Sequence, residues 1–331
     1  MKTKSIDYDR WSGERLGVWS RSWVITTAGL RQLMGYKFFK ILLFIGWTGG
    51  MAVAAAGFLF AQTMAEGGWL ADMAVKAGPR AEAVMQAITA LLLVFPDLLV
   101  TTAFKGIFWG HSELGLVLNL AAMALLVPQL ITRDRASHAL TIYLARPITA
   151  RDYLVGKLGV IVGVLLLLWT GPLVFGWLLA MVLSPNSLFF SYSLDALGVA
   201  LLFNLIAMVV IAGMALGVSA LAKTAARARL AWIGLWIVLS AVAAHAKVLP
   251  GWIRHLSFVS DLRIVRDEVF GMQDAMMDAA DIVPMINPRL AEQITEVAVR
   301  LDTSEITGVA VMLTLMVGAA LWMVRGRIKP E

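Results

Sequence analysis

The 331-residue chain has no cysteine, and only 15% of its residues are charged. The lack of cysteine excludes disulfide scaffolds, thiolate metal sites and cysteine nucleophiles. Soluble globular domains carry about 25% charged residues, whereas 60% of this chain is hydrophobic and its mean hydropathy is +0.79. These values indicate one polytopic membrane domain. The net charge of +6 does not suggest nucleic-acid binding, because basic residues in a membrane protein mainly report its orientation.

Motifs for nucleotide, metal and proton chemistry are also missing. A phosphate-binding loop requires G-x-x-x-x-G-K-[ST], and Gly156–Lys157 has neither the earlier glycine nor a following Ser or Thr. The 4 histidines lack the paired spacing that a metal or haem site needs. No row of acidic residues or histidines crosses the apolar segments, which argues against a proton-driven carrier. We therefore expect no catalytic, cofactor-binding or metal-binding residues in this chain.

Apolar segments long enough to cross a bilayer recur along the chain. They lie at about 38–61, 113–131, 153–183, 194–222, 230–249 and 306–324. A further apolar stretch, 87–104, is interrupted by Pro96 and Asp97. Without a crossing there, 19 of the 28 Lys and Arg residues lie on one side and 9 on the other; with one, the split is 15 to 13. Because basic residues concentrate in cytoplasmic loops, we predict six spans, cytoplasmic termini, and 87–104 either re-entrant or on the outer face.

Small residues and prolines predict how these helices pack. Gly46, Gly49 and Gly50 in the first span, and the small residues between positions 212 and 220, would allow neighbouring helices to approach closely. Gly171–Pro172 should kink the third span. Residues 16–36 interleave tryptophan and leucine with arginine, which is typical of an amphipathic helix in the membrane interface. The alternative is that this stretch simply starts the first span.

The segment 250–305 is predicted to hold two amphipathic helices outside the membrane. In the first, Leu262, Val265, Val269, Met272 and Met276 share a face, and Ser260 is placed as its cap. Asn287–Pro288 would start the second. These helices would cap the outer mouth of the membrane domain or dock an extracytoplasmic accessory protein. The expected divisions are an N-terminal and interfacial part at 1–40, membrane spans at 41–249, the extracytoplasmic helices at 250–305, and the last span with its cytoplasmic tail at 306–331.

The longest basic and polar interruption between apolar segments is RDRASHALTIYLARPITARDYLVGK, residues 133–157, called here the signature segment. Leu140, Tyr143 and Leu144 share one helical face, and Pro147 ends the run. We predict a short cytoplasmic helix at about 134–146, where it is available to a partner in the water.

The signature segment resembles the signature of ABC-2 type transporter permeases, which has an acidic residue, a leucine-rich helix, Leu-x-Arg-Pro, a small polar pair and Gly-Lys. Asp134 stands at the acidic position, and Gly156–Lys157 closes the match. His138–Ala139 stand where the family usually has Gly-Thr. The residues that fit between are Leu140, Tyr143, Leu144, Arg146, Pro147, Thr149 and Arg151.

The resemblance implies an all-α integral membrane protein of about six transmembrane helices, with an interfacial N-terminal helix and a cytoplasmic coupling helix. It implies a permease subunit, of an exporter rather than an importer, in a bacterial or archaeal inner membrane. A separate ATP-binding subunit would bind the ATP, and a second permease copy or paralogue would complete the membrane part. The residues implied at the ATPase interface are Asp134, Arg135, Leu140, Tyr143, Leu144, Arg146 and Pro147.

Two questions remain open from the sequence. Asn204, in the fourth span, is a candidate for the translocation pathway, but a hydrogen bond between helices would explain it equally well. The alternative to a permease is a membrane anchor that scaffolds a multiprotein complex without transporting anything. Such an anchor would keep the spans and would not need an ATPase.

Overall fold

The computed structural model describes residues 17–63, 68–94, 100–137, 149–185, 187–245, 251–282, 288–301 and 304–327. Within these ranges the protein is helical and contains no strand, so the predicted all-α class is confirmed. Six helices are long and apolar enough to cross a membrane, as predicted. They are α2 (Lys37–Thr63), α5 (Thr101–Val127) with η2 (Pro128–Thr132) and α6 (Arg133–Ala136), α8 (Ala150–Leu165) with η3 (Leu166–Thr170) and α9 (Gly171–Leu183), α10 (Leu188–Leu221), α11 (Ala225–Ile233) with η4 (Gly234–Val238) and α12 (Leu239–Ala244), and α16 (Ile306–Arg327).

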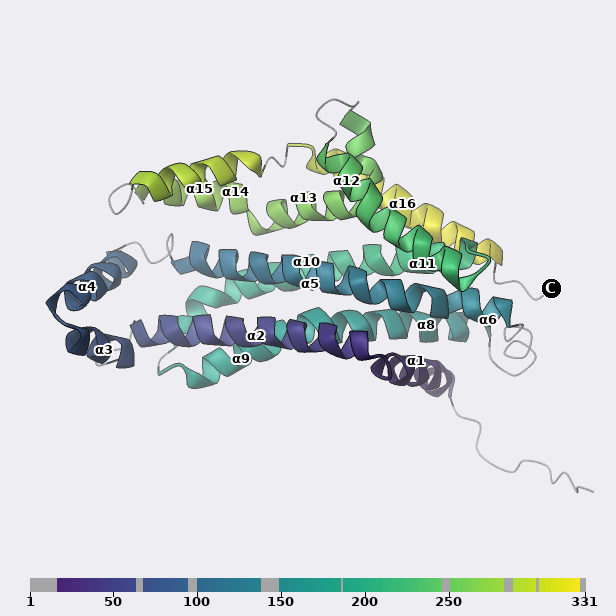
Figure 1. The fold of residues 1–331 in the computed structure, drawn as a ribbon, viewed down its shortest axis with the longest axis horizontal. Coiled ribbons are helices and arrows are strands. Elements are labelled where there is room, and N and C mark those ends of the chain that lie inside the picture. The colour runs from purple at the N-terminus through teal and green to yellow at the C-terminus, as the bar shows by residue number, and fades with distance from the viewer. Residues whose placement is uncertain are drawn as a thin grey trace, which may run out of the picture.

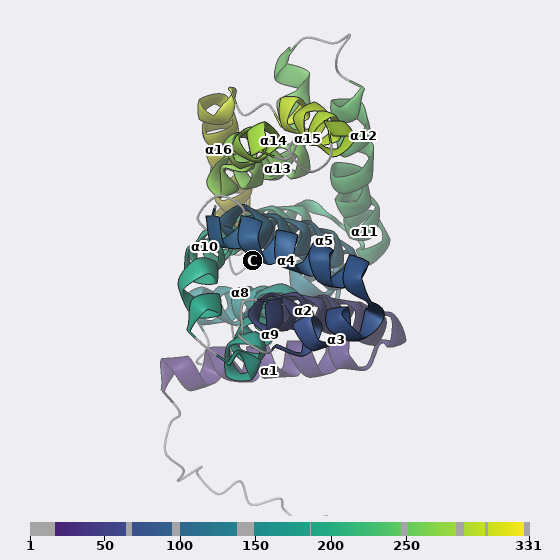
Figure 2. The same cartoon turned by 90° about the vertical axis from the view of Figure 1, so that its left-hand side faces the viewer.

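Most of the spans run along the long axis of the molecule (Figure 1). One end, called here the α1 end, carries α1 (Val18–Met34), α6 and the C-terminal end of α16. The opposite end, called the α4 end, carries the helices α3 (Trp69–Ala77) and α4 (Pro79–Val94). Figure 2 shows α1 running across the bundle rather than along it. Its exposed Trp19 and Trp23 and its charged Arg31 suit a helix in the interface.

The second span begins earlier than predicted. The sequence indicated 113–131, whereas one helix runs from Thr101 to Ala136. Two charged residues of this helix are paired: Lys105 lies 3.8 Å from Asp195, and Glu113 pairs with Arg263. The stretch 87–104 divides between α4, which is not one of the six span helices, and the start of α5. Within the described residues it therefore adds no seventh span.

Glycines allow the close helix contacts that the sequence predicted. A Cβ on Gly50 would lie 2.3 Å from the Pro172 carbonyl oxygen, and one on Gly176 would lie 2.1 Å from the Gly50 oxygen, so α2 and α9 touch at backbone distance. A Cβ on Gly217 would meet Ala320 of α16 at 2.7 Å. In a membrane such contacts replace the hydrophobic effect as the reason for helices to associate.

The third span is interrupted where the sequence predicted. The π-turn η3 immediately precedes Gly171–Pro172. Pro172 has no N–H to donate to a carbonyl in the preceding turn, so the regular α-helical ladder cannot continue through it. The freed Leu168 carbonyl faces α2, where a Cβ on Gly46 would lie only 2.5 Å from it.

The segment before the last span holds η6 (Gly251–Leu256), α13 (Phe258–Phe270), α14 (Met272–Ile282) and α15 (Pro288–Arg300). Gly271, with φ of 56°, ends α13 in the left-handed conformation that favours glycine. The predicted cap was wrong by one turn, since the hydroxyl of Ser257 accepts the Ser260 N–H. Pro288 opens α15 as predicted. α13 packs against α5, α10 and α16, so this segment rests on the membrane bundle.

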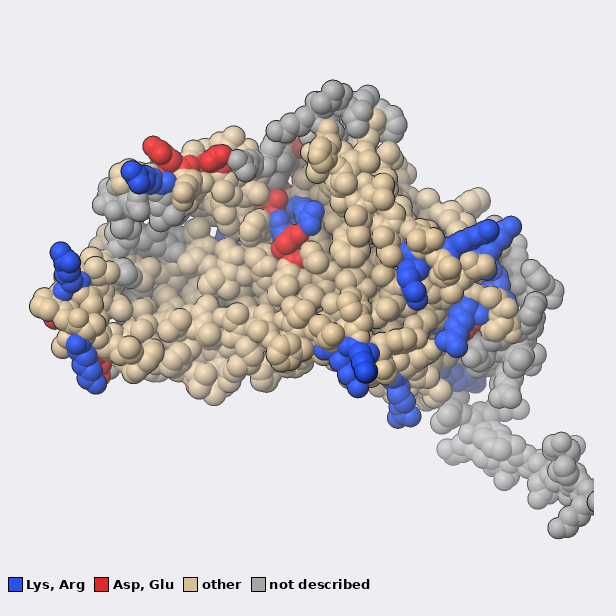
Figure 3. All heavy atoms as spheres, viewed as in Figure 1, with Lys and Arg blue, Asp and Glu red and all other residues tan. Residues whose placement is uncertain are grey.

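Charge is distributed unevenly over the surface shown in Figure 3. Lys and Arg gather towards the α1 end, and the middle of this face is largely uncharged. One cluster of both signs interrupts the uncharged region. Exposed large side chains such as Phe44, Leu205 and Trp322 lie on the span helices. In a bilayer such side chains contact lipid.

Candidate functional site

Only part of the predicted ATPase interface lies within the described residues. Asp134 and Arg135 belong to α6, the last turn of the second span helix. The predicted coupling helix at 134–146 extends beyond it, and Leu140, Tyr143, Leu144, Arg146 and Pro147 lie outside the described residues. The described structure thus shows how the two ends of the signature segment are held, at 133–137 and 149–157.

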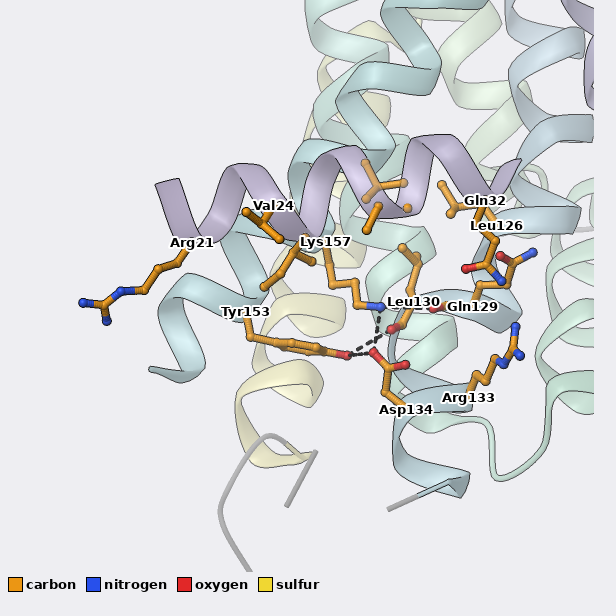
Figure 4. A pocket seen from close by; sticks show the side chains of 14 residues that line it. Arg21, Val24, Gln32, Leu126, Gln129, Leu130, Arg133, Asp134, Tyr153 and Lys157 are labelled. Atoms are coloured by element: carbon orange, nitrogen blue, oxygen red, sulfur yellow. Dashed lines mark hydrogen bonds and ion pairs between the residues drawn. The ribbon is translucent and has the colours of Figure 1, made fainter. Parts of the chain in front are cut away.

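Those two ends are joined by an ion pair. Lys157 Nζ lies 2.7 Å from Asp134 Oδ2, and the two side chains are only 14% and 17% exposed. The Tyr153 hydroxyl donates to the same carboxylate oxygen at 2.8 Å (Figure 4). We call these three residues the Asp134 clamp. The ammonium also lies 5.4 Å from the centre of the Tyr153 ring. A charge-assisted pair shielded from water is stronger than a surface salt bridge.

The clamp also holds the π-turn η2. Lys157 Nζ donates to the Gln129 carbonyl at 3.2 Å, and the Tyr153 hydroxyl lies 3.0 Å from the Leu130 carbonyl oxygen. A π-turn displaces carbonyls from the regular ladder, and buried backbone groups need other partners. Lys157, the last position of the family signature, and Tyr153 therefore support the π-turn that lies just before the signature segment, and Asp134 holds both side chains in place.

Ser219 of α10 secures the opposite side of η2. Its hydroxyl accepts the backbone N–H groups of Ile131 and Thr132 at 2.9 and 3.1 Å. The Thr132 hydroxyl in turn donates to the Ser219 carbonyl at 2.7 Å. Ser219 is fully buried. The packing of small residues predicted for this stretch thus includes one specific polar contact with the second span.

Arginine side chains complete the backbone hydrogen bonding at the α1 end. Arg135 donates to the carbonyls of Ala220 and Ala222, where α10 ends and its last carbonyls lack helical partners. Pro128 cannot donate to the Ala124 carbonyl, and Arg229 of α11 donates to it instead, at 3.3 Å. Arg135 therefore ties α6 to α10 within this chain.

α1 is fixed to α8 beside the clamp. A Cβ on Gly156 would lie 2.7 Å from the Cβ of Ile25, so only glycine permits this approach. The Thr26 hydroxyl donates to the Gly156 carbonyl at 3.1 Å, and that of Ser22 donates to the Asp152 carbonyl at 3.0 Å. In the Gly-Lys pair of the signature, Gly156 thus allows α1 to pack closely on α8, and Lys157 pairs with Asp134.

Two residues of this arrangement were missed from the sequence. Tyr153 was not singled out, and Ser219 was counted only among the small residues between positions 212 and 220. Tyr153 does lie one helical turn before Lys157, a spacing that brings side chains together on a helix. That spacing was the available signal for Tyr153. Nothing local marks Ser219, because its partners lie more than 80 residues away.

A second polar cluster joins α5 to α13 further towards the α4 end. Glu113 pairs with Arg263 and Arg266, and Arg266 also pairs with Asp267 at 2.8 Å. The guanidinium of Arg266 lies 4.2 Å from the centre of the Trp109 ring, and Trp109 Nε1 donates to Asp267 at 2.6 Å. Arg266 is buried, so these partners compensate a charge that would otherwise be costly.

Asp261 forms a third group, at the start of α13. Its Oδ1 lies 2.9 Å from His255 Nδ1, and His255 Nε2 lies 3.3 Å from Glu305, near the start of α16. Burial raises the pKa of Asp261 to about 6; the negative charge of Glu305 adds to this, and His255 opposes it. The group links η6 and α13 to the residue that precedes the last span.

Asn204 lies in the interior of the bundle. Its amide nitrogen donates to the Thr170 hydroxyl of η3 at 3.2 Å. One of the two roles considered for it, a hydrogen bond between helices, is thus observed. Its part in a translocation pathway stays a prediction.

These contacts attach the two described ends of the signature segment to three of the span helices. The Asp134 clamp joins α6 to α8, and Ser219 joins η2 to α10.

A family model described as ABC-2 family transporter protein matches residues 71–257, which is more than half of the chain and includes the whole signature segment. Comparisons with curated proteins and with solved structures found no match. The matched region, the six span helices and the signature held at both ends agree with one another. The chain therefore belongs to the ABC-2 family of transporter proteins and is a permease, the membrane-spanning component of an ABC transporter.

Proposed function

We propose that this permease exports its substrate, driven by a separate ATP-binding subunit that docks on residues 134–146 at the α1 end. The observation that carries the proposal is the ion pair between Asp134 and Lys157. It fixes both ends of the signature segment to the membrane helices, so that force applied to the segment reaches those helices directly. The resemblance of the signature to that of ABC-2 permeases supports export and the separate ATPase.

The charge distribution supports an orientation with the α1 end in the cytoplasm. Lys and Arg gather there in Figure 3; the short loop before α11 carries Lys223, and the first turn of α11 carries Arg227. Short basic loops stay on the cytoplasmic side of a membrane. In this orientation both termini are cytoplasmic, α1 lies in the inner leaflet interface, and α13–α15 belong to the extracytoplasmic side of a bacterial or archaeal inner membrane.

The second span offers a continuous path for transmission. Thr101–Ala136 is one helix of 36 residues, about 54 Å long. Asp134 lies near one end, and Glu113 lies about 30 Å back along the helix, a distance close to the hydrocarbon thickness. Rigid-body movement of this helix would transfer closure of the ATPase to the cluster of Glu113, Arg263 and Arg266.

The complete transporter needs partners besides the ATPase. We propose a second permease, either a copy or a paralogue, with the translocation pathway completed between the two. In this arrangement ATP binds only to the partner subunit. The exposed side of α14 and α15 remains available to an extracytoplasmic accessory protein.

A pull-down from gently solubilised membranes tests the proposal. Wild type should bring down an ATP-binding subunit, and Tyr143→Asp or Leu144→Asp should release it. Val299→Asp is the matched control, because Val299 is 63% exposed on α15, outside the span helices. Thermal unfolding of each variant shows whether the membrane domain stays folded. If wild type captures no ATPase from membranes of its own host, the anchor alternative replaces the proposal.

A further inference from the structure

A pocket of about 490 Å³ lies beside the Asp134 clamp. α1 packs along α8, and the pocket separates α1 from the end of α5, η2 and α6. Its volume falls in the range of small-molecule sites. Figure 4 shows α1 on one side of it and Tyr153, Lys157 and Asp134 on the other.

The walls of the pocket are of two kinds. Val24, Ile25 and Ala28 of α1 face Leu126 and Val160 across it, which makes one part apolar. The other part is polar. In Figure 4 Gln32, Gln129 and Arg133 lie together at one side, away from Tyr153. A ligand that fills the pocket must therefore have an apolar part and a polar part.

The side chains that line the pocket carry a net positive charge, which favours an anionic ligand. Arg21, Arg133 and Lys157 line the pocket, against one carboxylate, Asp134. Asp134 neutralises Lys157 at 2.7 Å, and Arg21 lies 4.0 Å from Asp152 outside the pocket. Within the described part of the chain, Arg133 has no ion-pair partner. A guanidinium with a neighbouring amide matches the oxygens of a phosphate.

The depth of the pocket identifies the source of that anion. Trp19 and Trp23 of α1 are 83% and 66% exposed, and tryptophan on such a helix lies at the level of the lipid headgroups. A pocket behind this helix therefore opens at the depth where lipid phosphates and the first acyl carbons are found. Basic pockets between membrane helices bind anionic headgroups in this way.

We propose that this pocket binds one anionic phospholipid. Its phosphate lies at Arg133 and Gln32, and the first carbons of its chains lie along Ala28, Leu126 and Val160. The lipid fills the space between α1 and the second span and so supports the Asp134 clamp from the membrane side. The site does not depend on the ATPase, and its test uses the permease alone.

Binding is measured by thermal unfolding of the purified permease in neutral detergent during titration with short-chain phosphatidylglycerol. Phosphatidylcholine of the same chain length and inorganic phosphate are titrated separately. Phosphatidylglycerol should raise the unfolding temperature at concentrations where the other two have no effect. Arg133→Gln should weaken that binding about tenfold, as expected for loss of one charge-assisted contact. Ala28→Trp, which fills the apolar part, should abolish it.

The matched control is Arg151→Gln, an exposed arginine of α8 at the same end that does not line the pocket. It should bind phosphatidylglycerol as wild type does. The proposal is overturned if Arg133→Gln and Arg151→Gln weaken binding equally, since the effect is then surface charge alone. An equal response to phosphatidylcholine, or the same stabilisation by inorganic phosphate, also overturns it. Arg133 is a surface side chain, so its variant is expected to fold even if Ala28→Trp does not.

Discussion

Replacing Lys157 with methionine tests the Asp134 clamp. Methionine keeps the apolar stem of the side chain but removes the ammonium, which contacts Asp134 at 2.7 Å and the Gln129 carbonyl at 3.2 Å. Hydrogen bonds to charged groups contribute about 1.5–3 kcal/mol each, and a fully exposed ion pair contributes at most about 1 kcal/mol. Because both side chains are less than one-fifth exposed, we expect Lys157→Met to destabilise the permease by about 2–3 kcal/mol.

A double-mutant cycle separates the pair from its surroundings. Asp134→Asn, Lys157→Met and the double variant are unfolded at equilibrium in mixed micelles and followed by circular dichroism. The expected coupling between the two positions is about 1–2 kcal/mol. Arg151→Met, an exposed cation on the same helix, should change the free energy of unfolding by less than about 0.5 kcal/mol. A coupling below that value would mean that the two charges do not stabilise each other, and the reasoning would fail.

Three further predictions follow from other contacts. Gly156→Val should lower the thermal stability and release α1 to proteolysis, because its Cβ would meet Ile25, whereas Gly234→Val, with open space around it, should do neither. Ser219→Val should cost about 2–3 kcal/mol by leaving two N–H groups of η2 unpaired; an unchanged unfolding curve would exclude this contact. Asp261→Asn should flatten the dependence of stability on pH between about 4 and 6.

The sign of that pH dependence follows from the raised pKa. Burial disfavours the ionised form of Asp261, so between its ordinary value of 3.8 and about 6 the folded state holds a proton that the unfolded chain has lost. Wild-type stability should therefore fall as the pH rises through this window, by up to about 3 kcal/mol. His255 and Glu305 face the same carboxyl group and remain in the variant. If Asp261→Asn shows the same fall as wild type, another group is responsible.

The six span helices could be predicted from the sequence because hydropathy is a local property. Six span helices and the glycine contacts of α2 agree with the predictions. The start of the second span was misplaced because Lys105 interrupts the apolar residues before position 113. The partner of Lys105, Asp195, comes much later in the chain, and no local pattern indicates that this charge will be paired.

The resemblance to a family signature pointed to the candidate site, but the contacts between its side chains could not be predicted from the sequence. The signature placed Asp134 at one end and Lys157 at the other, but nothing in the spacing says that they touch. Contact requires that α5 and α8 pack side by side and that Tyr153 points towards η2. The role of Arg135 also depends on the tertiary fold, because the carbonyls to which it donates belong to the end of α10.

Crosslinking from the signature segment is the most direct test of the central claim, that an ATP-binding subunit docks there. The chain contains no cysteine, so one introduced cysteine is unique. A Thr141→Cys variant in native membranes, treated with a short bifunctional reagent, should give one crosslinked product that contains an ATP-binding subunit. Thr295→Cys, on α15 of the extramembrane segment, should give no such product. An ATPase crosslinked from Thr295→Cys and not from Thr141→Cys would contradict the account.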